Sequence, residues 1–238
     1  MRGESSAGEG IEKQNGGSGG GNTDSEREQL DHGVWDEPGF SPELAGRVPE
    51  SELTYERWLR RRRADTSAAR SWMTAALVAV LAGPWAIFGA LWGTGRTPFS
   101  VLGLTVFGPV TEEIMKVALV LYILETRPYL FRSRVQVIFC AVAGAAGFAV
   151  VENLLYLYVY VPDASPLLFH WRWTVCTTLH VGCSLIAGLG LARVWRGVWK
   201  RMVRPRVSGL YPYLLGAIVL HGCYNGLALL LSAAGFQF

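Results

Sequence analysis

The stretch Val135–Tyr160, VQVIFCAVAGAAGFAVVENLLYLYVY, is apolar over nearly its whole length and carries one charged side chain, Glu152. A helix of about 20 apolar residues crosses the roughly 30 Å hydrocarbon core of a bilayer, so this stretch predicts a transmembrane helix. Four more apolar stretches have a similar length: Ser71–Gly93, Phe99–Leu124, Trp173–Arg193 and Leu210–Ser232. Backbone amides in lipid must be satisfied internally, which favours helices at these lengths. The sequence therefore predicts an all-α, polytopic transmembrane bundle of about five spans.

The polar residues are concentrated at the N-terminal end of the chain. Of the 19 acidic residues in the 238-residue sequence, all but five lie at or before Asp65. Residues 1–50 are rich in Gly, Ser, Glu and Asp, a composition that buries too little surface to offset the entropy of ordering, so we predict a disordered cytoplasmic tail. Residues 51–66, with Ser51 or Thr54 as the helix cap, predict a basic amphipathic helix at the membrane surface. Residues 71–238 form the predicted membrane domain.

Basic residues predict the orientation of the spans. They gather before the first span, between the second and third, and between the fourth and fifth: Arg60–Arg63, Arg127, Arg132, Arg134, Arg193, Arg196, Lys200, Arg201, Arg204 and Arg206. The other connections hold only Arg96 and Arg172. The positive-inside rule then places the N-terminus in the cytoplasm and the C-terminus outside. Because these residues flank apolar runs, the net charge of +3 does not indicate nucleic-acid binding.

Three carboxylates lie deep within the predicted spans, namely Glu112, Glu113 and Glu152. A carboxylate at the centre of a spanning helix costs about 2.5–3.5 kcal/mol on insertion scales, so such groups face the interior of a bundle and mark functional sites. Counted from the predicted outer ends, Glu112, Glu152, His180 and His221 fall in one layer between the midplane and the outer face. We therefore predict one shared pocket to which four helices contribute.

Local spacing adds partners to these groups. In EEIMK, Lys116 lies four residues after Glu112 and three after Glu113, so the three side chains can pair along one helix. Asn153 follows Glu152, and in HGCYN His221 and Asn225 lie one turn apart. Such a set can activate water: a carboxylate accepts a proton, a second acid or imidazole returns it to a leaving amine, and an amide with an imidazole stabilises an oxyanion. Each motif alone can also be a structural ion pair or an interhelical hydrogen bond.

The ordered motifs EEIMK (112–116), FAVVEN (148–153), His180 and HGCYN (221–225) resemble those of the PrsW family of bacterial intramembrane proteases. That family is similar at a distance to the CAAX prenyl endopeptidases and to the bacteriocin-processing Abi family. The resemblance covers about 71–238 and implies an intramembrane protease domain in a bacterial cell membrane. It also implies a membrane-anchored substrate with a single span, an anti-sigma factor being the best-known type.

The resemblance also implies roles for the site residues. Glu112 would be the general base, Glu113 and Lys116 would orient it, and Glu152 and His180 would be partners in the water site. Asn153, adjacent to Glu152, counts among the catalytic residues. His221 and Asn225 would form the oxyanion side. Where CAAX enzymes have a histidine in the second motif this chain has Glu152, which argues against prenylated substrates.

The sequence leaves the cofactor and two other functions open. Glu112, Glu152, His180 and His221 could assemble a zinc-like site, yet there is no HExxH motif and the same groups can act without a metal, which the sequence slightly favours. Carboxylates and imidazoles at the midplane also occur in ion-coupled transporters and proton relays, which would show ion flux and internal repeats. A non-enzymatic membrane scaffold would tolerate Glu112→Gln.

Overall fold

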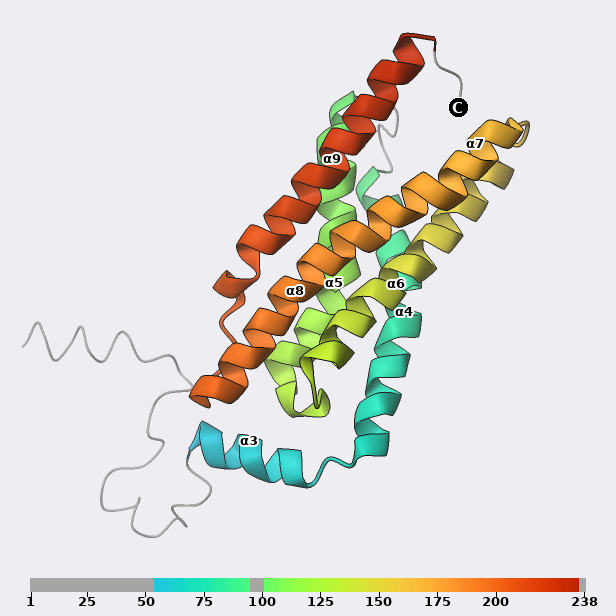
Figure 1. Ribbon diagram of the computed structural model, residues 1–238. Coiled ribbons are helices and arrows are strands. Elements are labelled where there is room, and N and C mark those ends of the chain that lie inside the picture. The colour runs from blue at the N-terminus through green and yellow to red at the C-terminus, as the bar shows by residue number, and fades with distance from the viewer. Residues whose placement is uncertain (1–53, 95–100, 236–238) are drawn as a thin grey trace, which may run out of the picture. The chain divides into compact units, whose positions relative to one another are not determined.

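The computed structural model describes residues 54–94 and 101–235, and every regular element in these ranges is a helix (Figure 1). The elements that line the bundle or precede it are α3 (Tyr55–Ala64), α4 (Ala68–Thr94), η2 (Gly103–Phe107), α5 (Gly108–Thr126), η3 (Pro128–Leu130), α6 (Arg134–Leu155), η4 (Tyr156–Tyr160), α7 (Pro166–Trp171), η5 (Arg172–Cys176), α8 (Thr177–Arg201), η6 (Val207–Gly209) and α9 (Tyr211–Ala233). The tail predicted over residues 1–50 lies outside the described residues.

The predicted spans correspond to helices of the bundle. Four helical segments are long and apolar enough to cross a membrane: Ala68–Phe88, Arg134–Tyr160, Pro166–Arg201 and Tyr211–Ala233. The fifth predicted span is α5 with η2 before it, and α5 carries the charged residues Glu112, Glu113 and Lys116. The all-α bundle is thus confirmed, and the predicted count of about five spans agrees with it.

The fourth span is longer than the sequence analysis predicted. Helical structure runs from Pro166 through η5 to Arg201 instead of beginning at Trp173. Ser165 caps this helix by accepting a hydrogen bond from the Leu168 amide, and Pro166 takes the first helical position, where its missing N–H costs nothing. The placement of Arg172 in a loop was therefore wrong, because that residue lies within a helix.

The helices pack closely through small residues. Gly83 of α4 faces the backbone of α6, where an added Cβ would lie 2.8 Å from the Phe148 amide nitrogen, and Gly144 of α6 meets Ala82 in the same way. Such close backbone approach stabilises helix pairs in lipid, where no hydrophobic effect drives association. Helix α6 packs against both α4 and α8, and the α8–α9 contact completes the bundle. The charged stretch of α5 is consequently enclosed by other helices.

Helix α3 lies near the end of the bundle opposite η2, η4 and η5 (Figure 1). Thr54 caps it by accepting from the Arg57 amide, and Leu59 is its buried residue. Arg63 donates to the carbonyl oxygen of Phe131 at 2.9 Å, which ties the helix to the connection between α5 and α6. The element falls within the predicted helix at 51–66, and its location at a membrane surface stays a prediction.

Helix α9 approaches η2 so closely that the contact depends on glycine. A Cβ at Gly222 would lie 2.4 Å from the Thr105 carbonyl oxygen, whereas one at Gly226, a turn later, would lie 3.8 Å from the Thr105 side chain. We expect Gly222→Ala to lower the free energy of unfolding by about 1–3 kcal/mol because overpacking separates the two backbones. Gly226→Ala is the matched control and should be neutral or stabilising. Thermal unfolding in detergent, followed by tryptophan fluorescence, measures both, and equal midpoints would contradict the expectation.

Candidate functional site

Three of the four charged residues of α5, Glu112, Glu113 and Lys116, form a buried ion-pair cluster. The Lys116 ammonium nitrogen lies 2.8 Å from Oε1 of Glu113 and 3.7 Å from Oε2 of Glu112. The side chains of Lys116 and Glu113 are only 1% and 0% exposed. Lys116 also lies over the ring of Phe148 on α6, 4.2 Å from its centroid. The ammonium of Lys116 therefore offsets the negative charge of both carboxylates. Without a cation nearby, an ionised carboxylate in this buried place would be strongly destabilised.

His221 joins α9 to both carboxylates. Its Nδ1 lies 2.9 Å from Oε1 of Glu113, and its Nε2 lies 3.8 Å from Oε2 of Glu112. A deprotonated Glu113 can only accept, so Nδ1 donates to it, and in the neutral form of His221 the proton on Nδ1 leaves Nε2 with its lone pair. The carboxylate of Glu113 thereby fixes both the tautomer and the ring orientation of His221. Its free nitrogen faces Glu112.

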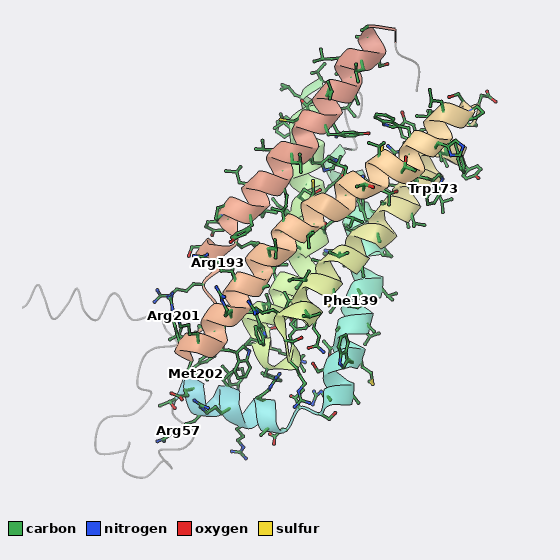
Figure 2. The ribbon with its side chains drawn as sticks, viewed as in Figure 1. Arg57, Phe139, Trp173, Arg193, Arg201 and Met202 are labelled. Atoms are coloured by element: carbon green, nitrogen blue, oxygen red, sulfur yellow. The ribbon has the colours of Figure 1, made fainter. Side chains whose placement is uncertain are left out.

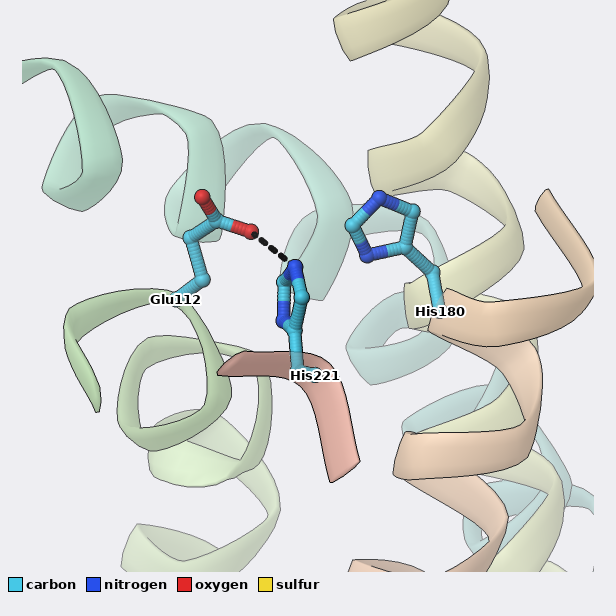
Figure 3. A group of neighbouring side chains, drawn as sticks. All are labelled: Glu112, His180 and His221. Carbon is cyan, nitrogen blue, oxygen red and sulfur yellow. Dashed lines mark ion pairs between the residues drawn. The ribbon is translucent and has the colours of Figure 1, made fainter. Parts of the chain in front are cut away.

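His180 joins α8 to the same cluster from the other side. Its Nδ1 lies 2.9 Å from the Lys116 ammonium nitrogen, and its Nε2 lies 2.9 Å from Oε2 of Glu152. The two imidazole rings are nearly perpendicular, with centroids 5.0 Å apart. Figure 3 shows Glu112 and both imidazoles turned toward one another. Side chains from α5, α6, α8 and α9, which the sequence predicted to share one layer, are thus in contact.

Three π-helical segments adjoin this cluster. The segment η2 ends five residues before Glu112, η4 begins four residues after Glu152, and η5 ends four residues before His180. A π-helical turn widens the helix and shifts the face on which later residues lie, and such turns occur often at functional sites. Here they lie at one end of the bundle (Figure 1), next to three of the four helices that supply the site.

The two asparagines lie apart from the cluster. The Asn153 amide donates to the Arg172 carbonyl oxygen and to Oγ1 of Thr177, both at 3.1 Å. The Asn225 amide donates to the Leu104 carbonyl oxygen of η2 at 2.9 Å. Both amide groups therefore connect helices in the structure. The predicted oxyanion role of Asn225 requires its amide to leave Leu104.

Arg172 is a site residue that the sequence analysis missed. Its guanidinium lies 2.8 Å from Oε2 of Glu152, the oxygen that also contacts His180, and stacks 4.3 Å from the centroid of Tyr156. Because Asn153 holds the carbonyl of Arg172, both residues of the Glu-Asn pair contact this arginine. The Ser165-Pro166 cap signal would have revealed that Arg172 belongs to the helix of His180. Sequence alone could not show that its side chain meets Glu152.

Comparison with known families decides the assignment. Residues 66–238 match the family described as PrsW family intramembrane metalloprotease. This chain belongs to the PrsW family. No curated protein and no solved structure matched the chain. The PrsW membership, together with the apolar helices, makes it a multi-pass membrane protein and a membrane-embedded peptidase.

The metal implied by the PrsW description has a candidate site in this chain. One ligand atom each from Glu112, His180 and His221 lies within 4.8 Å of the others, and two imidazoles with one carboxylate form a donor set that zinc prefers. Oε2 of Glu112 is buried and has no hydrogen-bond partner among the described residues. The residues fit a metal, and the family description favours the metal-dependent form over the metal-free form that the sequence slightly favoured.

Arg172 in this PrsW chain is expected to act through Glu152 on His180. Arg172→Gln should lower kcat/KM about 10- to 100-fold, mainly through kcat, because partners that orient active-site histidines have effects of this size. Arg172→Lys keeps the charge and should recover part of the loss. Arg134→Gln, an exposed arginine on α6, is the control. Cleavage kinetics on a membrane-anchored substrate measure the effect, and a change confined to KM would contradict it.

Proposed function

We propose that this protein hydrolyses a peptide bond of a single-span membrane protein, such as a membrane-anchored anti-sigma factor. The observation that carries the proposal is that ligand atoms of Glu112, His180 and His221, from three different helices, lie within 4.8 Å of one another inside a membrane-embedded bundle. Structural hydrogen bonding would not require a buried lysine, three carboxylates and two imidazoles in one network. We further propose a bacterial cell membrane, with the N-terminus cytoplasmic and the C-terminus outside. The relationship to the CAAX and Abi families stays a prediction.

The proposed reaction begins with Glu112. Its buried Oε2 has no hydrogen-bond partner among the described residues, so it can accept a proton from a water that attacks the scissile carbonyl carbon. Glu112 then passes that proton to the amide nitrogen as the C–N bond breaks, which yields a carboxylate and an amine. Glu113 orients His221, and Glu152 orients His180, on either side of the reacting carbonyl. Lys116 stabilises the charged forms of Glu112 and Glu113.

A metal fits this arrangement without replacing these roles. Glu112, His180 and His221 would hold the ion, and a zinc ion bound there supplies Lewis-acid polarisation of the scissile carbonyl. The Glu112 carboxylate has two oxygens, so one can ligate while the other accepts a proton. The Glu113 and Glu152 carboxylates would then orient the two histidine ligands, and Nδ1 of His180 would bind the metal in place of the Lys116 ammonium that lies 2.9 Å from it.

Reconstitution tests the proposed function. The full chain in proteoliposomes should cleave a co-reconstituted single-span substrate within or beside its apolar segment, as mass spectrometry of the products would show. With 1,10-phenanthroline the activity should disappear, and added zinc should restore it. Intact substrate under all conditions, with ion flux across the same vesicles, would instead support the transporter alternative.

A further inference from the structure

A basic cavity lies far from the site just described, at the end of α8. Its volume is about 230 Å³, and it is enclosed by the last turns of α8, the chain that follows and η6. Four guanidinium groups line it, those of Arg193, Arg201, Arg204 and Arg206, with Val194, Val198 and Gly197 among the remaining lining residues. Figure 2 shows Arg193 and Arg201 at this end of the helix.

Three of the arginines at this cavity have no carboxylate partner in the part of the chain that the structure describes. None of the lining residues that the structure describes is acidic. Arg193, Arg201 and Arg206 form no ion pair with any residue that the structure describes. Like charges placed around one concave surface repel one another, and an anion in the cavity removes that repulsion. Guanidinium groups bind phosphate by paired, charge-assisted hydrogen bonds, which makes a phosphate group the best-matched anion.

Gly197 keeps the cavity open. Glycine is a poor residue for a helix interior, and elsewhere in this bundle it permits close packing against a neighbouring helix. At Gly197 an added Cβ would meet no atom within 4 Å, so the protein's own packing does not require glycine there. The missing side chain leaves space inside the cavity.

The chain after α8 is folded back to complete the cavity. Met202 takes left-handed backbone angles, with φ at 53° and ψ at 38°, and is the only described residue other than glycine with a positive φ. Residues with a Cβ adopt this conformation uncommonly. The turn brings Arg204 and Arg206 to the same cavity as Arg193 and Arg201, although Arg193 lies two turns earlier in α8.

The location of the cavity identifies the source of the phosphate. Trp195 and Trp199 lie in the same turns of α8 as the lining residues Val194 and Val198, and tryptophan is enriched at the level of lipid headgroups. Arg63 of α3 stacks on Trp199, so the basic helix lies at the same end. Val194 and Val198 add an apolar part to the lining, which suits the acyl methylenes of a lipid rather than a free phosphate ion. We propose that this cavity binds the phosphate headgroup of an anionic phospholipid.

Lipid binding to the full chain tests the proposal. Native mass spectrometry and thermal shift in detergent would be measured with phosphatidylglycerol, phosphatidylcholine and inorganic phosphate. Phosphatidylglycerol should bind and stabilise the wild type, whereas phosphatidylcholine and inorganic phosphate should not. The double variant Arg193→Gln/Arg201→Gln should bind phosphatidylglycerol at least about 10-fold more weakly, given the contribution of each basic residue near an anionic surface.

Two further variants keep the test decisive. Arg196→Gln/Lys200→Gln removes the same charge from the same helix outside the cavity lining and should retain binding. Gly197→Leu keeps every charge but fills the cavity, and should weaken binding as much as the arginine double variant does. Equal losses in the two double variants, or undiminished binding by Gly197→Leu, would overturn the site. Equal stabilisation by inorganic phosphate would overturn the lipid assignment.

Discussion

A Glu112→Gln chain should insert and fold like the wild type and lose about 1,000-fold or more in kcat/KM. A positioned general base contributes about 10²–10⁴-fold, and glutamine cannot accept the proton. The fold should survive because Oε2 of Glu112 has no hydrogen-bond partner among the described residues, and Lys116 keeps its closer carboxylate, Glu113, at 2.8 Å. Cleavage of a reconstituted single-span substrate measures the loss.

The control for this variant lies on the same helix. Glu125, near the other end of α5, is exposed, so Glu125→Gln removes a carboxylate from α5 without touching the cluster. It should cleave at the wild-type rate. A Glu112→Gln chain that cleaves within about threefold of the wild type would remove Glu112 from the mechanism, and a scaffold function would then fit better.

Lys116→Met should have the largest effect on stability. It leaves Glu113 as a buried carboxylate without its cation, and removing one partner of a buried ion pair costs about 3–5 kcal/mol in measured cases. Lys116 also contacts His180 and the Phe148 ring, so the orientation of the His180 imidazole should change. We expect the thermal midpoint in detergent to fall by about 10 °C or more.

A compensating variant separates charge from packing. In Lys116→Met/Glu113→Gln the uncompensated carboxylate is gone, so much of the stability should return while activity does not. If Lys116→Met alone unfolds at the wild-type temperature, the ion pair does not hold α5 in the bundle. If the double variant is less stable than Lys116→Met, the cost lies in packing rather than in charge.

The spans were predictable because lipid imposes a simple rule on sequence. A run of about 20 apolar residues predicts a transmembrane helix. The runs at 135–160 and 210–232 match helical segments to within a residue or two at each end. The contact among Glu112, Glu152, His180 and His221 also followed from depth, since the cost of charge in lipid drives such groups toward one another.

The finer connections were not predictable, and the π-helical segments explain why. Each such segment rotates the residues beyond it relative to a regular α-helix, so faces assigned from a period of 3.6 fail across it. Arg172 lies in η5 and Leu104 in η2, and these two are the partners of the Glu-Asn pair and of Asn225. Asn153 and Asn225 were assigned to the reaction because they lie close in sequence to Glu152 and His221. In the structure their side-chain amides instead form hydrogen bonds between helices.

The central claim is that Glu112 and His180, on different helices, act at one reaction centre. The most direct test compares single-turnover cleavage rates of Glu112→Asp, His180→Gln and the chain with both changes, in proteoliposomes with enzyme in excess. Residues that work as a unit have non-additive effects. The single-turnover rate of the double variant should therefore lie within about threefold of the rate of the slower single variant. If the two losses multiply instead, the residues act independently, and the account of one shared site is contradicted.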